Sequence, residues 1–432
     1  MRLAVYEDQT ATGFGPIAAL RPVFELMCGA FTARARLTEF LPVTEWGVFL
    51  REELAETYRE EHPTAAINDF AWLQHGPTLL VNGRWLPTRD ALARINENEV
   101  GLVDNTVVSL TLDPLEAALL SDIPWDDALL QIARTRKFVD VPGTVARHPW
   151  DLVNHNAHQL QDDFTPQRGR SSCNDLGTQV AVLGSPNLVH VSPSATVEPF
   201  VVLDVRRGPI WVDDAAIIQA HTRIEGPCFI GRGSQLLRAN IRGGTTIGPA
   251  CRIGGEVEES IIHGYANKYH AGFLGHAYVC PWVNLGAMTT NSDRKNDYSE
   301  VRVPLTGEML ESGSSKVGCF IGDHTKTALS SLFNTGSSVG VMCTVVPGGR
   351  LLPKHIPSFS FVRHGELASA WDLEAGLEAA RAAMSRRNVE LTPAQERLLR
   401  RHFDATQDER EQAFRFQREK REEAPTPVER PL

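Results

Sequence analysis

The sequence predicts an α/β domain, then a coil of parallel strands, then a helical C-terminal segment. Aliphatic residues recur every six positions between Val212 and Leu351. The first 165 residues alternate short apolar runs with helical patterns, which is typical of a mostly parallel sheet. Residues 367–423 are highly charged and keep apolar residues at helical spacing.

The six-residue period predicts the coil, because a helix repeats its apolar positions every three or four residues and a strand every two. Stacked turns of such a coil bury one aliphatic column that no single turn can bury alone. Ordinary antiparallel strands with coincidental spacing are the alternative, and the persistence of the period argues against them. The runs are Val212, Ile218, Ile224, Ile230 and Leu236; Ile241, Ile247 and Ile253; Phe273, Val279 and Leu285; and Ile321, Thr327, Phe333, Val339, Val345 and Leu351.

The N-terminal part predicts several short elements. We expect strands over 3–6, 46–50 and 78–81, the last ended by the turn dipeptide Asn82-Gly83. Helical patterns cover 25–40, 52–61, 114–120, 125–132 and 150–163. In the C-terminal part, Thr392-Pro393 is typical of a helix start.

We expect five segments along the chain. They are an α/β domain over 1–165, a linker over 166–188, the coil over 189–362, a helical segment over 363–423 and a disordered tail over 424–432. Polar stretches at 291–298 and 304–315 interrupt the coil rhythm. Insertions that leave a regular scaffold are frequent binding loops.

Composition restricts the class of protein. The chain has 432 residues, 42% of them hydrophobic, and a net charge of −10, which argues against non-specific binding to nucleic acid or to an anionic membrane. The seven cysteines include no CxxC pair, so we expect reduced thiols and a cytoplasmic protein. No run reaches the roughly 18 apolar residues that a membrane span needs.

Residues 254–298 hold the most informative polar side chains. An imidazole such as His270 can take a proton from an attacking amine or hydroxyl near neutral pH. Lys268 can balance a phosphate, and Asn284 and Asn291 can bind sugar hydroxyls or an amide. On residue type alone, a surface histidine without a catalytic role is the commoner case.

Residues 190–362 resemble the hexapeptide-repeat acyltransferases, which fold as a left-handed parallel β-helix. More narrowly, the chain resembles the bifunctional UDP-N-acetylglucosamine pyrophosphorylase and glucosamine-1-phosphate N-acetyltransferase family, in a branch described as sugar nucleotidyltransferases. The N-terminal domain shares LRPVFELMCGAFTARARL. The coil shares GGEVEESII, NKYHAGFLG, WVNLGAMTTNSDRKNDYSEV, IGDHTKTALSSLFNTG and PSFSFV.

The resemblance implies a transferase with specific site residues. His270 matches the acetyltransferase base, and the sugar- and phosphate-binding residues fall on Asn284, Lys268 and Arg242. Two further positions, Ala287 and Asn291, match residues near the thioester of acetyl-CoA. The family binds the coenzyme between subunits, so the resemblance implies a homotrimer that uses sugar phosphate and nucleoside triphosphate.

Two departures from the family's pattern affect the phosphate contact and the nucleotide loop. Glu258 stands where the family carries a lysine, and a carboxylate there would repel a phosphate, so the acceptor sugar differs or Lys268 makes the contact. The dense glycine loop of the nucleotidyltransferases is also missing.

Gly13, Gly15 and Arg21 remain as nucleotide-binding candidates. The family resemblance implies an aspartate for Mg²⁺ after the strand at 78–81, where the chain offers Asn82-Gly83-Arg84. Asp104 lies in another strand-like stretch.

Three functions therefore stay open. The first is a sugar-nucleotide enzyme that transfers an acetyl group on the coil and a nucleotidyl group on the N-terminal domain, with Mg²⁺ if that domain is active. The second is a nucleotidyltransferase whose coil only trimerises and regulates it. The third is a scaffold without catalysis.

Overall fold

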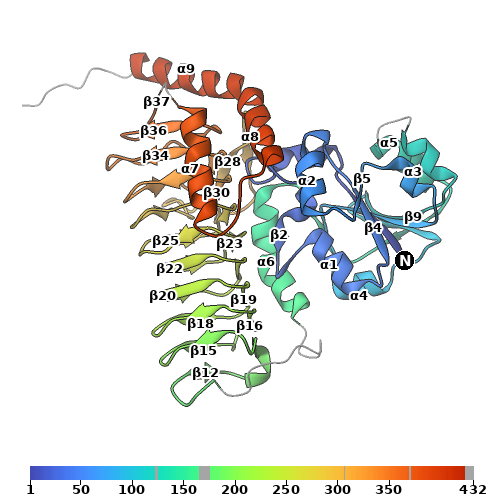
Figure 1. The fold of residues 1–432 in the computed structure, drawn as a ribbon, viewed down its shortest axis with the longest axis horizontal. Coiled ribbons are helices and arrows are strands. Elements are labelled where there is room, and N and C mark those ends of the chain that lie inside the picture. The colour runs from blue at the N-terminus through green and yellow to red at the C-terminus, as the bar shows by residue number, and fades with distance from the viewer. Residues whose placement is uncertain (122–124, 165–175, 306, 369–370, 424–432) are drawn as a thin grey trace, which may run out of the picture.

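The computed structural model describes the chain except for residues 122–124, 165–175, 306, 369–370 and 424–432. It has the three predicted parts (Figure 1). A tall column of short strands stands beside a smaller α/β domain, and C-terminal helices return along the column (Figure 1). The predicted linker lies partly, and the predicted tail wholly, outside the described residues.

The N-terminal domain is built on a mostly parallel sheet, as predicted. Val5 of the central strand pairs with Val48 on one side and Val81 on the other, both in parallel. Among the described strands of this sheet, only the strand at 106–112 runs antiparallel to its neighbours. The strands, in sheet order, are β10 (Lys137–Asp140), β8 (Glu99–Val103), β9 (Thr106–Leu112), β6 (Thr78–Asn82), β1 (Arg2–Tyr6), β4 (Glu45–Phe49) and β5 (Ala66–Ile67).

The helix expected over 25–40 was wrong in its first half. Residues Met27–Cys28 (β2) and Phe31–Thr32 (β3) form a hairpin, and only Ala33–Phe40 (α1) is helical. Gly29 turns this hairpin with φ +79°, and a Cβ there would lie 2.3 Å from a carboxylate oxygen of Asp163. The remaining helices are α2 (Ala55–Glu61), α3 (Phe70–Leu73), α4 (Arg89–Ala93), α5 (Trp125–Ala133) and α6 (Pro149–Asp163).

The shorter elements complete this domain. The helix expected over 114–120 is a 3-10 helix at Glu116–Ser121, and others span Gln9–Phe14, Val23–Glu25 and Glu52–Leu54. A small antiparallel pair joins β7 (Trp85–Leu86) to β11 (Thr144–Val145).

The coil is a parallel β-helix, and within the described residues most of its strands belong to two nine-stranded sheets. It begins at Ala181–Leu183, earlier than the expected residue 189. The first sheet bends around a corner and covers two faces, because the start of β20 pairs with β17 and its end with β18. Its strands are β12 (Ala181–Leu183), β14 (Thr196–Val197), β15 (Val202–Asp204), β17 (Ile217–Ile218), β18 (Arg223–Glu225), β20 (Gln235–Ile241), β22 (Arg252–Glu258), β24 (Asn267–Lys268) and β25 (Phe273–Gly275).

The second sheet runs the length of the column. It follows a 3-10 turn at Pro186–Leu188. Its strands are β13 (Val189–Val191), β16 (Ile210–Val212), β19 (Cys228–Ile230), β21 (Thr245–Ile247), β23 (Ile261–Ile262), β26 (Tyr278–Val279), β30 (Cys319–Ile321), β33 (Ser337–Val339) and β35 (His355–Ile356).

The last coils carry the remaining strands. The insertion expected at 304–315 contains an antiparallel hairpin. These strands are β27 (Thr290–Asn291), β28 (Arg302–Leu305), β29 (Glu308–Glu311), β31 (Lys326–Thr327), β32 (Leu332–Phe333), β34 (Thr344–Val346), β36 (Phe361–Arg363) and β37 (Glu366–Ala368).

The six-residue column is the core of the β-helix, with two corrections. Most of the predicted positions, from Val212 to Val345, are buried in one cluster. Phe273 and Leu351 are not in it, because Leu274 and Leu352 point inward in their place. The period slips by one residue where a turn changes length, and counting alone cannot detect that slip.

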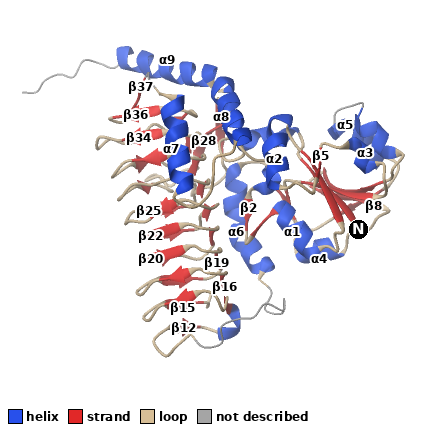
Figure 2. Cartoon of the chain, in the orientation of Figure 1, coloured by secondary structure: helices blue, strands red, loops and turns tan. Residues whose placement is uncertain are grey.

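The C-terminal segment is helical as predicted and packs against both other parts. Thr392 caps its second helix by accepting from the Gln395 N–H, with Pro393 at the first position. The helices are α7 (Leu373–Ser385), α8 (Pro393–Ala405) and α9 (Gln407–Glu423), drawn in blue in Figure 2. Within the described ranges, no helix is both long and apolar enough to cross a bilayer.

Helix α6 joins the N-terminal domain to the column, along which it lies (Figure 2). Its Asn156 is fully buried, and its side-chain oxygen accepts from the Gly29 N–H and from the Thr246 hydroxyl. Its amide N–H donates to the Gly244 carbonyl. One side chain thus links the hairpin, the helix and the β-helix.

Candidate functional site

His270 lies at a corner of the β-helix, in the turn between β24 and β25. Its side chain is exposed, and its ring centre is 5.0 Å from that of Tyr269. An exposed imidazole on a rigid edge is accessible to a substrate, which a general base requires.

The turn of the next coil stacks on the turn that holds His270. The Met288 N–H donates to the Ala271 carbonyl at 2.8 Å, and the Ala287 carbonyl accepts from the Ser330 N–H of the following coil at 2.8 Å. The predicted thioester neighbour Ala287 therefore lies one coil away from His270.

Asn284 and Asn267 form a short amide ladder at the start of the same corner. The Asn267 amide N–H donates to the Asn284 side-chain oxygen at 2.6 Å, and the two residues also form a parallel bridge. Asn284 precedes Ala287 by as many positions as Asn267 precedes His270. The structure thus brings together three predicted residues, His270, Asn284 and Ala287.

Lys268 is placed differently from its predicted phosphate-binding role. Its side chain is buried, and its ammonium donates to the carbonyl oxygens of Gly254 at 2.8 Å, Gly272 at 2.7 Å and His270 at 3.4 Å. Burial lowers the pKa of Lys268 to about 8. The ammonium therefore holds the backbone of the corner together from inside the coil and is not presented to a ligand.

Arg242 lies at another corner of the column. Arg242 directly follows β20, and the last residues of β20 pair with the last residues of β22. Those residues of β22 pair in turn with β25, the strand after the turn of His270, so Arg242 lies one strand length away from that turn. Its guanidinium is 3.5 Å from Glu225 and 3.4 Å from Glu256. Within one chain, the structure does not bring Arg242 to His270.

Asn291 is buried inside the coil and holds the backbone of its neighbour. Its side-chain oxygen accepts from the Gly275 N–H at 2.9 Å, and its amide N–H donates to the Gly275 carbonyl at 2.9 Å. Both halves of the amide are therefore engaged by protein, which gives Asn291 a structural position.

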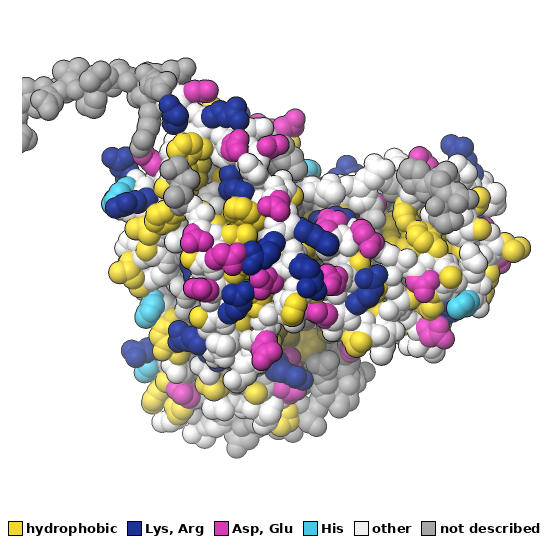
Figure 3. Space-filling view, turned by 45° about the horizontal axis from the view of Figure 1, so that its top comes forward, with side chains coloured by type: hydrophobic (Ala, Val, Ile, Leu, Met, Phe, Trp, Pro, Cys, Tyr) yellow, Lys and Arg dark blue, Asp and Glu magenta, His cyan; other side chains and the backbone are white. Residues whose placement is uncertain are grey.

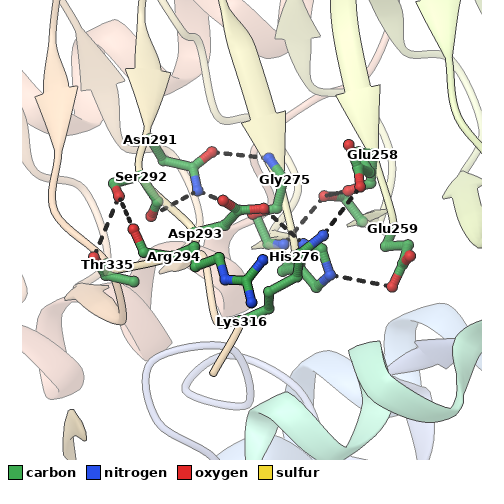
Figure 4. A network of polar contacts seen from close by, with 12 residues as sticks. Glu258, Glu259, Gly275, His276, Asn291, Ser292, Asp293, Arg294, Lys316 and Thr335 are labelled. Atoms are coloured by element: carbon green, nitrogen blue, oxygen red, sulfur yellow. Dashed lines mark hydrogen bonds and ion pairs between the residues drawn. The ribbon is translucent and has the colours of Figure 1, made fainter. Parts of the chain in front are cut away.

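A second histidine, His276, lies at the centre of a polar network (Figure 4). Its Nδ1 is 2.9 Å from Asp293 and its Nε2 is 3.1 Å from Glu259. Burial alone would lower the pKa of His276, but the hydrogen bonds with Asp293 and Glu259 raise it to about 9. Both ring nitrogens hold a proton and a partner, so His276 is an ionic link between coils and not a base.

The sequence analysis missed this network, although a signal was present. His276 and Asp293 are separated by 17 positions, as are many cross-coil hydrogen-bond partners in the column, such as Asn267 and Asn284. Charges of opposite sign one coil apart predict such links. The unexpected Glu258 belongs here too, since Lys316 lies 3.3 Å from its carboxylate.

Arg238 is a further residue that residue type alone did not distinguish. It is exposed, with φ +48°, in the bend of β20. The preceding Leu237 pairs with Gly254, whose carbonyl accepts from Lys268 of the next coil. Arg238 therefore lies on the corner column of His270, two coils toward the start of the β-helix.

The predicted nucleotide loop does not form a close glycine cradle. Gly13 lies in a 3-10 helix, Gln9–Phe14, and both Gly13 and Gly15 have open space where a Cβ would be. Neither has a positive φ. Nothing in this backbone requires glycine for close approach to a phosphate.

Arg21, the third nucleotide-binding candidate, is bound to the β-helix. Its guanidinium donates to both carboxylate oxygens of Asp323, one at 3.0 Å, and to the Ile17 carbonyl. The two side chains are 15% and 3% exposed. The structure therefore gives Arg21 a role in domain packing.

The residues at the end of β1 do not fit a magnesium ion. The Asp8 carboxylate receives both the Arg84 guanidinium and the Asn82 amide N–H, so its oxygens are already neutralised. Asp104 lies in an exposed turn, 4.0 Å from Arg147. Mg²⁺ needs carboxylate oxygens free to bind it, and the described residues contain no group of three acidic, histidine or cysteine side chains suited to a metal.

Comparison with known proteins bears on the N-terminal domain first. Residues 3–171 match the family model described as sugar nucleotidyl transferase. The match covers the sheet, α6 and the segment that carries Arg21. The β-helix lies outside this nucleotidyl transferase match.

Curated relatives combine the two activities in their names. A bifunctional sugar-1-phosphate nucleotidylyltransferase/acetyltransferase of Sulfurisphaera tokodaii is 32% identical over 93 residues, 22% of this chain and 23% of that protein. The bifunctional protein GlmU of Nitratidesulfovibrio vulgaris (strain DP4) is 25% identical over 41% of this chain and 40% of its own. GlmU of Methanocaldococcus jannaschii is 26% identical over 50% and 46%. The chain thus spans less than half the length of these relatives.

Solved structures resemble the chain only distantly. A hexapeptide transferase family protein from Anaplasma phagocytophilum is 13% identical, with 48% of this chain and 92% of that chain covered and a TM-score of 0.20. The Arabidopsis UDP-N-acetylglucosamine acyltransferase is 10% identical, with 49% and 77% covered and a TM-score of 0.18. Scores this low carry no weight for the fold, which rests on the strand pairing described above.

Proposed function

We propose that the protein is a transferase of sugar-nucleotide biosynthesis whose β-helix acetylates an amino sugar 1-phosphate from acetyl-CoA. The observation that carries this proposal is the exposed His270 on the same corner as Asn284 and Ala287, on adjacent coils. The names of the curated relatives support the reaction class.

In the proposed reaction, the sugar amine attacks the thioester carbonyl carbon of acetyl-CoA. A C–N bond forms, the C–S bond breaks, and His270 takes the proton that the amine loses. The coenzyme leaves as a thiolate that takes up one proton, so thiol and N-acetyl sugar are the products. Asn291 is left out of this step, because its amide is fully used by Gly275.

Arg238 is our candidate for the contact with the sugar phosphate. Lys268 is turned inward, Arg242 is paired with two glutamates at another corner, and Glu258 is paired with Lys316. Arg238 is exposed on the column of His270, and coils about 4.8 Å apart place it on the order of 10 Å away. A hexosamine 1-phosphate can span that distance.

Assembly and compartment are part of the proposal. A single column presents His270 on an open edge, and a second copy against that edge would make a cleft for the coenzyme, in keeping with the homotrimer that the family resemblance implies. The cysteines of the described ranges are free thiols, which agrees with the cytoplasm.

Nucleotidyl transfer is the second candidate, favoured by the match of residues 3–171. The Asp8–Arg84 pair weighs against metal-dependent chemistry at the end of β1. Without such chemistry, the N-terminal domain would serve mainly to bind the β-helix and hold it in position.

The test is a panel of amino sugar 1-phosphates with acetyl-CoA, read out as free thiol, beside release of pyrophosphate from nucleoside triphosphates. Thiol release that depends on one amino sugar 1-phosphate supports the proposal. Pyrophosphate release with no thiol release by the intact protein favours the second candidate, and neither activity contradicts both.

A further inference from the structure

A cavity lies between all three parts of the chain and plays no part in the proposed acetyl transfer. Its volume is about 610 Å³, within the range of small-molecule sites. The N-terminal domain contributes Arg21 and Tyr58, the β-helix Trp282 and His324, and the C-terminal helices a wall of Met384, Leu391, Leu398 and Leu399.

Aromatic rings from successive coils form the β-helix wall of this cavity. Tyr265 stacks on Trp282 with ring centres 4.5 Å apart, and Trp282 stacks on His324 at 6.2 Å. All three residues have positive φ, so the corner projects them outward. Because both faces of the indole are covered, a ligand can contact Trp282 only at a ring edge, and the indole N–H makes no hydrogen bond within the described residues.

The His324 ring makes no hydrogen bond within the part of the chain that the structure describes. It is 7% exposed, its Nδ1 is buried without a hydrogen bond, and its Nε2 makes none within the described residues. Burial lowers the pKa of His324 to about 4, so the ring is neutral. An orphaned buried N–H is rarer than an orphaned acceptor, which favours the proton on Nε2, the nitrogen that is not closed off. His324, which lines the cavity, can then donate this N–H to a ligand.

The cations around the cavity are paired, while Glu61, exposed on its lining, makes no ion pair within the described residues. Arg21 is paired with Asp323, and Glu25 is paired with Arg34 and accepts from the Tyr58 hydroxyl. Burial also lowers the pKa of His263 to about 4, and its Nε2 lies 2.7 Å from the Glu25 carbonyl. No cation of the described lining is left to neutralise a phosphate, while the apolar helical wall favours a partly apolar molecule.

We propose that this cavity binds an uncharged heterocycle of the nucleoside class, whose acceptor groups take the N–H groups of Trp282 and His324. This site is separate from the corner of His270, so it does not depend on the proposed acetyl transfer. Its ligand would join the N-terminal domain, the β-helix and the C-terminal helices.

Polar contacts also join α2 and α8, two of the helices that line the cavity. Arg397 of α8 contacts Glu56 of α2, and the Thr392 hydroxyl donates to Glu60 at 2.5 Å. Figure 3 shows acidic and basic side chains alternating across the middle of the face that it draws. Exposed pairs of this kind are individually weak, so the ligand is expected to raise the melting temperature measurably.

The experiment titrates the full-length protein with uridine, thymidine, adenosine and guanosine, and with their 5′-monophosphates, by tryptophan fluorescence and thermal shift. We expect saturable binding of at least one nucleoside, at least tenfold weaker binding of its monophosphate, and at least tenfold weaker binding to His324→Ala. The matched control is His355→Ala, because His355 also has a buried Nδ1 without a partner but lies outside this cavity.

A second arm uses Trp282→Phe, which keeps the stacked ring and removes only the N–H donor. Circular dichroism confirms that each variant is folded, and weaker binding to this variant supports the proposal if His324→Ala does not fold. No saturable binding of any nucleoside, equal binding to the folded variants and wild type, or tighter binding of the monophosphates would overturn it.

Discussion

Arg21 donates to both carboxylate oxygens of Asp323, which joins the N-terminal domain to the β-helix across the interdomain cavity. The pair is nearly buried, with the two side chains 15% and 3% exposed. The arginine expected to bind a nucleotide thus holds two domains together.

The first prediction follows from this pair. Asp323→Asn leaves a buried guanidinium without its counter-charge, and we expect a loss of roughly 3–5 kcal/mol in the free energy of unfolding. Denaturant unfolding measures it. Arg400→Ala breaks exposed pairs with Glu374 and Glu396 and is expected to change the same quantity by less than about 1 kcal/mol. Equal effects of the two variants would contradict the interdomain role.

The second prediction separates Lys268 from a substrate contact. Lys268→Met removes the donor to three backbone carbonyls at the corner, so we expect a loss of roughly 1–3 kcal/mol in stability. If Lys268 instead bound phosphate, the variant would unfold like the wild type and show a raised KM for the sugar phosphate. Chemical denaturation and thiol-release kinetics on the same preparation decide between these outcomes.

The third prediction concerns pH and His276. Its pKa is raised to about 9 in the folded protein, above about 6.5 in the unfolded chain, so folding takes up a proton. The resulting stabilisation is complete below about pH 6.5 and is lost as pH rises to about 9. Asp293 and Glu259, whose pKa values are lowered, keep their contribution until the solution is acidic.

We therefore expect His276→Gln to melt lower than the wild type at pH 6, with the difference shrinking as pH rises to about 9. Thermal melts across this range provide the measurement. His221→Gln, at an exposed corner, is the control and should show no such trend. A difference in melting temperature for His276→Gln that is constant with pH would exclude the ionic link.

The fourth prediction tests the phosphate contact. Arg238→Ala is expected to raise the KM for the amino sugar 1-phosphate about tenfold, with little change in the KM for acetyl-CoA. Arg242→Ala, a cation at another corner, is the matched control and should leave both values near those of the wild type. The opposite pattern would return the phosphate contact to Arg242, supplied across a subunit interface.

Much of the fold could be predicted from sequence because it is periodic. The six-residue column is read directly from Val212 to Val345, since each inward position must be filled by an apolar side chain. The hairpin before α1 was missed because Leu26, Ala30 and Ala33 happen to fall at helical spacing, while the turn at Gly29 is set by contacts with α6.

The site was only partly predictable. Sequence places His270, Asn284 and Ala287 on one corner, because residues about one coil apart stack. It cannot tell which side of the wall a side chain faces, so Lys268 and Asn291 were assigned to a substrate although both point inward. The packing role of Arg21 could not be predicted either, since its partner Asp323 lies 302 positions away in the sequence.

The most direct test of the central claim compares His270→Ala with His221→Ala, since both histidines are exposed at corners of the same column. The measurement is thiol release from acetyl-CoA at saturating amino sugar 1-phosphate. We predict a fall in kcat of about 10²–10⁴-fold for His270→Ala and none for His221→Ala. Full turnover by His270→Ala would contradict it.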